Sequence, residues 1–198
     1  ILERHAVTWP YVLYAGAIKP QKNLPRLIDA FAVAKAELAA ANPEFAHLKL
    51  LVIGEAPTRH AELRSAVVRA RVKEDVRFLG FLPQPLLRVF YARAQAFLFP
   101  SLYEGFGLPP LEAMAHGVPV LTSNVSSLPE VFREAALLVN PENIFDIARG
   151  IRQILTDQSL RETLIRNGTI RARSLSWQQA AARVREAYER VHKGGTAA

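Results

Sequence analysis

The residue pattern best suited to chemistry is a pair of carboxylates, Glu104 and Glu112, eight residues apart around a glycine-containing turn. Gly105 and Gly107 stand in that turn, where we expect them to take positive φ and let the backbone approach a ligand closely. A helix should begin after the turn, and helix N-termini present amide donors and a partial positive charge. Amides for phosphate, next to carboxylates for hydroxyls, would suit a phosphorylated sugar.

The groups that can donate hydrogen bonds define the expected anion site in this loop. Pro109 and Pro110 have no N–H, so an anion would be held by the main-chain amides just before them. We therefore predict that phosphate or sugar oxygens meet the N–H groups of Phe106, Gly107 and Leu108.

We expect the two carboxylates to face one pocket. Glu112 would lie in the first turn of a helix predicted over residues 111–116, and its oxygens could accept hydrogen bonds from a ribose, as acidic residues do in other nucleotide sites. Glu104 would sit beside the glycines and face the same pocket with free acceptors. Alone, either residue could be a loop charge or an acid favoured at a helix start, but the pair around the turn favours a binding site.

A second candidate loop runs over residues 16–23 and joins the first predicted strand to the first predicted helix. Lys22 stands at the helix entrance, followed by Asn23 as the expected N-cap, and it would make a point-charge contact to phosphate. A lysine before a helix is commonly a solvated charge. This signal gains weight because both loops should lie at the carboxyl edge of one sheet.

Six short apolar runs alternate with helical patterns, and the spacing leaves room for crossover helices. The predicted class is therefore α/β: a Rossmann-like parallel six-stranded sheet with helices on both faces. Pro119 argues that its strand is not deeply central, or that the proline nitrogen faces no neighbour. The strands are predicted over residues 11–15, 48–53, 76–79, 96–99, 118–122 and 136–139, and the helices over 24–42, 58–71, 86–94, 111–116, 144–155, 159–173 and 176–191.

Composition and charge exclude several classes of protein. The 198 residues contain no cysteine, which excludes disulfides, thiolate metal sites and a cysteine nucleophile. The five histidines show no metal-ligand spacing, so no metal is expected. Of the net charge of +7, residues 149–193 carry a surplus of six, from ten basic and four acidic residues. A solvated arginine-rich helix face accounts for this surplus, with contact to a further domain or an anionic membrane surface as alternatives.

Residues 100–120, PSLYEGFGLPPLEAMAHGVPV, resemble the glutamate–seven–glutamate motif of retaining GT-B glycosyltransferases, family 4 in particular. The resemblance extends over most of residues 11–191 through three further segments, YAGAIKPQKNLP, RFLGFLP and SNVSSLPEV. It implies the C-terminal, donor-binding half of a two-domain enzyme. The implied parts are a linker remnant over residues 1–10, a nucleotide-sugar-binding domain over 11–175, a basic helix over 176–193 and a disordered tail over 194–198.

The resemblance also implies a role for each matching residue. Glu112 would bind the donor ribose, Glu104 would contact the transferred sugar near the reacting carbon, and Lys22 would neutralise the diphosphate. Many relatives have an arginine where this chain has Ala17, and Lys19 is a candidate replacement. The remaining donor contacts would come from Gly16, from the amides of Phe106, Gly107 and Leu108, and from the segment between Phe78 and Leu82, which would lie near the nucleobase.

The expected function is retaining transfer of a hexosyl group, with mannosyl among the candidates, from a nucleotide diphosphate sugar to a glycan or lipid-linked acceptor. The resemblance implies no cofactor and no required metal, and an acceptor site in a missing N-terminal domain. We expect a cytoplasmic protein, with peripheral contact to the inner face of the membrane as an extension, and no nucleic-acid partner. The alternatives are a nucleotide-sugar epimerase, whose catalytic acids and histidine are not found, and a non-catalytic sugar-nucleotide-binding module.

Overall fold

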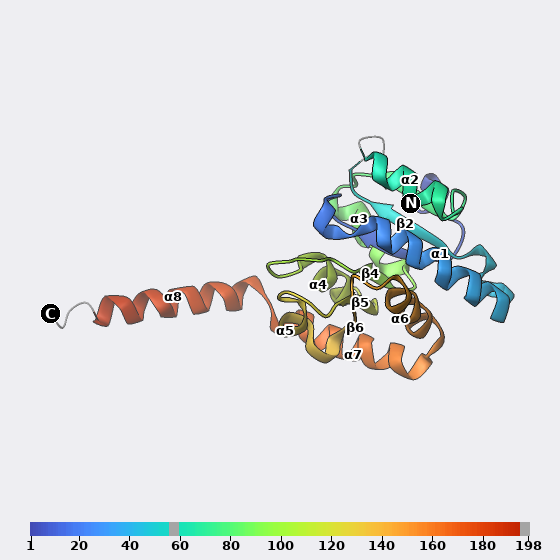
Figure 1. Ribbon diagram of the computed structural model, residues 1–198. Helices are drawn as coiled ribbons and strands as arrows, with labels where there is room; N and C mark the ends of the chain where they lie inside the picture. Colours follow the sequence, from blue (N-terminus) through green and yellow to red (C-terminus); the bar gives the residue numbers. More distant parts are fainter. Residues whose placement is uncertain (56–59, 195–198) are drawn as a thin grey trace.

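The computed structural model describes residues 1–55 and 60–194, in which helices and strands alternate along the chain (Figure 1). The strands are β1 (Tyr11–Ala15), β2 (Lys49–Ile53), β3 (Val76–Gly80), β4 (Phe97–Phe99), β5 (Val120–Ser123) and β6 (Leu137–Val139). The α-helices are α1 (Leu24–Ala41), α2 (Ala61–Arg69), α3 (Gln84–Arg93), α4 (Leu108–Ala115), α5 (Leu128–Phe132), α6 (Ile144–Thr156), α7 (Gln158–Ser174) and α8 (Trp177–Gly194). Short 3₁₀ turns are η1 (Glu3–His5), η2 (Pro20–Lys22), η3 (Pro43–His47) and η5 (Arg133–Ala135).

The six strands form one parallel sheet in the order β3-β2-β1-β4-β5-β6, so the predicted Rossmann-like α/β fold is confirmed. The chain moves outward from β1 to β3 and then returns to β4, on the other side of β1. Because parallel crossovers are right-handed, this reversal places α1 and α2 on one face and α3 and α4 on the other. Helix α6 packs on α1, and α7 packs on α4, which extends both layers.

The interior strands β1, β2, β4 and β5 are buried along almost their whole length, which explains why they appear in the sequence as continuous apolar runs rather than alternating ones. All five residues of β1 are buried, and β1 pairs residue by residue with β2. At the centre of the sheet, the rings of Tyr14 and Phe99 stack with centroids 5.8 Å apart. This aromatic pair joins β1 to β4 directly beneath the edge from which the candidate loops emerge.

The prediction drawn from Pro119 is wrong in its first form, because β5 is an interior strand that pairs with both β4 and β6. Pro119 stands just before β5, where its missing N–H is not needed, and its carbonyl accepts a hydrogen bond from Phe97 N at 2.9 Å. Helix α5 was absent from the predicted elements. It has five residues, with Pro129 in its first turn, so it is too short for a helical period to appear in the sequence.

The ends of the chain differ in how they meet the domain. Residues 1–10 pack against it, because Val7 is buried and the ring of Trp9 meets that of Tyr11 edge-on. Helix α8 extends away from the body (Figure 1), and Trp177 and Tyr188 on it are exposed. The predicted tail begins at Gly194, which is the last residue of α8, and its residues 195–198 lie outside the described residues, as do residues 58–59 of the predicted second helix. Within residues 1–55 and 60–194, no helix has the length and apolar character needed to span a bilayer.

Candidate functional site

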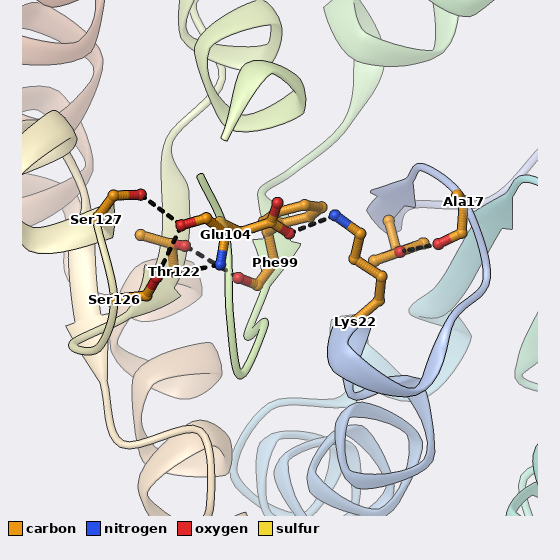
Figure 2. A network of polar contacts seen from close by, with 8 residues as sticks. Ala17, Lys22, Phe99, Glu104, Thr122, Ser126 and Ser127 are labelled. Carbon is orange, nitrogen blue, oxygen red and sulfur yellow. Dashed lines mark hydrogen bonds and ion pairs between the residues drawn. The ribbon is translucent and has the colours of Figure 1, made fainter. Parts of the chain in front are cut away.

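The candidate site lies where β1 and β4 are neighbours and their connections leave toward opposite sides of the sheet. Open parallel sheets bind ligands at such a switch point, outside the carboxyl ends of the strands. The loop after β1 and the loop after β4 meet there, and Leu102 N donates to Gln21 O at 2.8 Å. Lys22 on the first loop points to Glu104 on the second, and the two side chains form an ion pair (Figure 2).

Asn23 fixes the first loop against the rest of this edge. Its side chain is 3% exposed, and its amide donates to Pro100 O at 2.9 Å and to Pro141 O at 2.7 Å. Its backbone is left-handed, with φ 61°, and its side chain makes no capping bond to α1. The predicted N-cap role is therefore wrong: Asn23 occupies the cap position, but it acts as a buried cross-link between three loops.

The Lys22–Glu104 pair is largely shielded from water, with side-chain exposures of 15% and 11%. The ammonium also lies 5.0 Å from the centroid of the Phe99 ring, a cation–π arrangement. Burial, and then the charge of Glu104, raises the pKa of Tyr14 above its ordinary range. The Tyr14 hydroxyl therefore stays protonated, and it donates to Ala17 O at 2.9 Å.

The main chain of Glu104 is held from the other side by the loop that precedes α5. The hydroxyls of Ser126 and Ser127 donate to Glu104 O at 2.7 and 2.8 Å, and Glu104 N donates to Ser126 Oγ at 3.2 Å (Figure 2). Sequence reasoning gave these serines no role, although they belong to the SNVSSLPEV segment that carried the resemblance. That segment was the available signal for them.

The fold requires a glycine at position 107 of the turn. Its φ is 91°, and an added Cβ would lie 2.9 Å from Leu128 Cδ2 and 3.0 Å from the ring of Phe132, both on α5. Gly105 differs, because it is not among the described glycines with positive φ and a Cβ there would meet open space. The prediction of positive φ is thus confirmed for Gly107 and wrong for Gly105.

Helix α4 begins at Leu108, three residues before its predicted start, and includes both prolines in its first turn. Proline is accepted there because the first N–H groups of a helix have no partner within the helix. Glu112 consequently lies in the second turn rather than the first, which corrects the prediction. Of the three predicted amide donors, Phe106 and Leu108 are exposed, whereas Gly107 is buried against α5.

Glu112 is held by neutral groups from α3. Its Oε1 accepts from Gln84 Nε2 and its Oε2 from Tyr91 Oη, each at 3.2 Å. Its carbonyl oxygen lies 2.7 Å from Nδ1 of His116, and the His116 ring stacks on the ring of Tyr91 with centroids 5.4 Å apart. Glu104 and Glu112 therefore have separate partners, in contrast to the expected pair with free acceptors in one pocket.

A cavity of about 290 Å³ opens at the carboxyl ends of β1 and β2. Three of the predicted donor-binding residues line it: Gly16, Leu82 and Glu112. Phe81, from the predicted segment 78–82, also lines it, whereas Phe78 packs on the core. The other predicted contacts, Lys22, Phe106, Gly107 and Leu108, are not among the residues described around it. The complete described lining is Ala15, Gly16, Ala17, Ile53, Gly54, Glu55, Phe81, Leu82, Leu87, Tyr91, Pro109 and Glu112.

Glu112 also borders a larger groove of about 690 Å³, which Phe106 and Leu108 line together with the start of α8. Glu112 thus stands between the two hollows. Lys19 was the candidate replacement for the arginine that many relatives have where this chain has Ala17. It lines a third groove beside Arg26 and Asp29. The described lining of that groove shares no residue with the 290 Å³ cavity, so the structure does not bring Lys19 to the place of Ala17.

Comparison with known proteins identifies a family that matches this chain and two proteins with similar sequences. Residues 3–171 match the family described as glycosyl transferases group 1. The chain is 36% identical over 190 residues to O-antigen chain mannosyltransferase B of Escherichia coli, which covers 96% of this chain and 48% of that protein. It is 32% identical over 189 residues to the serotype-specific mannosyltransferase WbdA of Escherichia coli, over 96% of this chain and 23% of that protein.

The fold has counterparts among solved structures. Sucrose-phosphate synthase from Thermosynechococcus elongatus superposes with a TM-score of 0.79 and 30% identity, over 98% of this chain and 48% of that one. The chain therefore spans about half the length of the mannosyltransferase B and of the synthase that it matches.

Proposed function

Because the chain belongs to the glycosyl transferases group 1 family, we propose that it binds the nucleotide-sugar donor of a retaining hexosyl transfer, in the manner of a GT-B family 4 enzyme. The observation that carries the proposal is the position of Glu112. It borders the cavity at the sheet's switch point, on the opposite side of the Gly107 turn from the Lys22–Glu104 pair. One end of the turn thus carries a carboxylate for a ribose, and the other end holds, through Glu104, a cation for phosphate.

In the proposed complex the donor lies across this edge of the sheet. The nucleoside occupies the 290 Å³ cavity, with Gly16 and Leu82 against the base and Glu112 accepting hydrogen bonds from the ribose. The diphosphate takes Lys22 and the main-chain amides of Phe106 and Leu108, two exposed residues, as its donors. In the structure Lys22 is paired with Glu104, so binding exchanges one anionic partner of Lys22 for another.

The proposed chemistry follows from the charges that develop as the donor reacts. The bond between the anomeric carbon and the diphosphate oxygen breaks, and its electron pair stays on the diphosphate, where Lys22 and the amides stabilise the new charge. Glu104 stands near the electron-poor anomeric carbon. The acceptor hydroxyl attacks from the same face and passes its proton to the departing diphosphate oxygen, which retains the configuration. The proposal includes no metal, because Lys22 and the amides meet the diphosphate charge, and EDTA should leave transfer unchanged.

We propose mannosyl as the transferred group and a glycan, free or lipid-linked, as the acceptor, because the Escherichia coli relatives are named as mannosyltransferases and one acts on an O-antigen chain. The acceptor site belongs to the part of the enzyme beyond this chain, which spans about half of that relative. The proposed setting is the cytoplasmic face of a membrane, with the basic surplus of residues 149–193 toward anionic lipid.

Titration calorimetry with GDP and UDP tests the proposal. One of them should bind, and Glu112→Ala and Lys22→Ala should each weaken it about ten-fold or more, since hydrogen bonds to charged groups are worth roughly 1.5–3 kcal/mol. Lys73→Ala is the matched control, because Lys73 is an exposed lysine just before β3, at the amino end of the sheet. If neither site variant changes the affinity, the assigned pocket is wrong. Formation of an epimer from a sugar nucleotide without acceptor would instead support the epimerase.

A further inference from the structure

The Glu112 carboxylate is oriented by a neighbouring helix in the free protein. Gln84 and Tyr91 both lie on α3, about two turns apart, and each donates to a different oxygen of Glu112, which lies on α4. A carboxylate has about four lone-pair sites on its two oxygens. Two donors therefore fix its direction while acceptor capacity remains on each oxygen for a ligand.

Tyr91 is the better fixed of the two donors. It is 1% exposed, and its ring lies between Phe97, with centroids 5.5 Å apart, and His116, stacked at 5.4 Å. Gln84 is exposed, so fewer neighbours hold its side chain in place. The Tyr91 ring cannot turn away from Glu112 without displacing those neighbours, and interiors packed at this density resist such movement.

The Tyr91 hydroxyl remains a donor at all physiological pH values. Burial, and then the charge and hydrogen bond of Glu112, raises the pKa of Tyr91 above its ordinary range. The phenol therefore keeps its proton and presents it to Glu112, while Tyr91 itself lines the 290 Å³ cavity. His116 closes the arrangement, because it supports the Tyr91 ring and lies within hydrogen-bond distance of the Glu112 carbonyl oxygen.

From this geometry we propose that Tyr91 is a positioning residue that holds the Glu112 carboxylate toward the two ribose hydroxyls of the donor. The inference rests on the proposed function, since it takes the cavity to be the nucleoside site. Tyr91 acts through Glu112. Its hydrogen bond already orders the carboxylate in the free protein, so less side-chain entropy is lost when the ribose binds. Its contribution should consequently appear only with ligands that have ribose hydroxyls.

Calorimetry with GDP and UDP and their 2′,3′-dideoxy forms tests this role. For the nucleotide that binds, Tyr91→Phe should weaken the ribose form about ten-fold and leave the dideoxy form unchanged, so that discrimination between the two falls. Gln84→Ala should act in the same direction by about two- to three-fold, because its bond is exposed to water. It alters only a surface side chain and remains informative if Tyr91→Phe folds poorly. In a Glu112→Ala background, Tyr91→Phe should have no further effect.

Tyr11→Phe is the matched control. Tyr11 is a buried tyrosine of β1 whose hydroxyl donates to Phe90 O at 2.8 Å, so the variant loses a hydroxyl away from Glu112 and should keep the wild-type discrimination. Equal weakening of both nucleotide forms by Tyr91→Phe would overturn the proposal in favour of a packing role. Unchanged discrimination, together with a loss in Glu112→Ala, would overturn the positioning role alone. A wild-type protein that binds neither nucleotide would overturn the proposed function itself.

Discussion

The two ends of the loop between β4 and α4 carry the same side chain in opposite settings. At one end, Glu104 is paired with the cation of Lys22, from a loop 82 residues earlier in the chain. At the other end, Glu112 is held by the neutral donors of Gln84 and Tyr91. Glu104 is thus paired with a cation, whereas Glu112 has only neutral donors and retains oxygen lone pairs that can accept further hydrogen bonds. One binding loop can therefore carry a carboxylate whose cationic partner is exchanged on ligand binding and a second carboxylate that neighbouring donors orient in advance.

The contrast has a physical consequence for each end. The Lys22–Glu104 pair is mostly shielded from water, so removing one partner leaves a poorly solvated charge that seeks another. A diphosphate offers such a partner to Lys22. Glu112 does not need to exchange a partner, because its two hydrogen bonds from α3 leave its oxygens able to accept further hydrogen bonds from a ligand.

Gly107 joins the two ends, and Gly107→Ala should cost about 2–4 kcal/mol of unfolding free energy. The new Cβ would meet Leu128 and Phe132 at 2.9–3.0 Å, and the residue would keep a positive φ. Gly105→Ala in the same turn meets open space and should stay within about 1 kcal/mol of wild type. Urea unfolding measures both, and equal losses would show that the turn does not depend on α5.

Asn23→Ala should loosen the Glu104 end and lower the unfolding free energy by about 2–3 kcal/mol. Two buried carbonyls, Pro100 O and Pro141 O, would lose their donor. Asn167→Ala is the comparison, because that amide makes one exposed bond to Glu134 O at 3.2 Å and should cost less than about 1 kcal/mol. Denaturant titration measures the unfolding free energy of both variants. A smaller loss for Asn23→Ala than for Asn167→Ala would refute the cross-link role of Asn23.

Neutralising each carboxylate should change nucleoside diphosphate affinity in opposite directions. Glu104→Gln frees Lys22 from its anionic partner and should tighten binding about three- to ten-fold, whereas Glu112→Gln removes a charged acceptor and should weaken it about ten-fold. Calorimetry with the nucleotide that the wild type binds gives both values. Changes of the same sign would remove the distinction between the two ends.

The serines behind Glu104 should have the smallest effect. Ser126→Ala and Ser127→Ala each remove one donor to Glu104 O and should cost about 0.5–1.5 kcal/mol of stability. They should leave nucleoside affinity unchanged, because they hold the end of the loop away from Glu112. Ser174→Ala, which removes a bond within α7, serves as the control in thermal unfolding. A loss of nucleotide affinity in either loop variant would show that the two ends are coupled.

Much of the fold was predictable because its signals are local. Each strand is a short apolar run, as in Tyr11–Ala15, and each long helix repeats its apolar residues at the period of one face, as in Leu24–Ala41. Helix α5 was missed because five residues are fewer than two turns. The start of α4 was placed late because Pro109 and Pro110 were taken to precede the helix rather than to form its first turn.

The site was predictable only in part, because its composition is local and its contacts are not. The motif of residues 100–120 identified Glu104, Glu112 and Lys22 as candidates, but Asn23 finds its partners 77 and 118 residues away, and Tyr91 meets Glu112 from another helix. The packing of the helices and loops on the sheet sets such pairings, and residue spacing along the chain does not predict them.

The sequence alone determined which segments become strands and helices, and that one loop carries two acids around a glycine turn, since both depend on neighbours along the chain. Tertiary structure alone decided that Glu104 meets a cation and Glu112 meets a phenol. Crossover handedness and the packing of α3, α4 and α5 place those partners, which lie far from the two carboxylates along the chain.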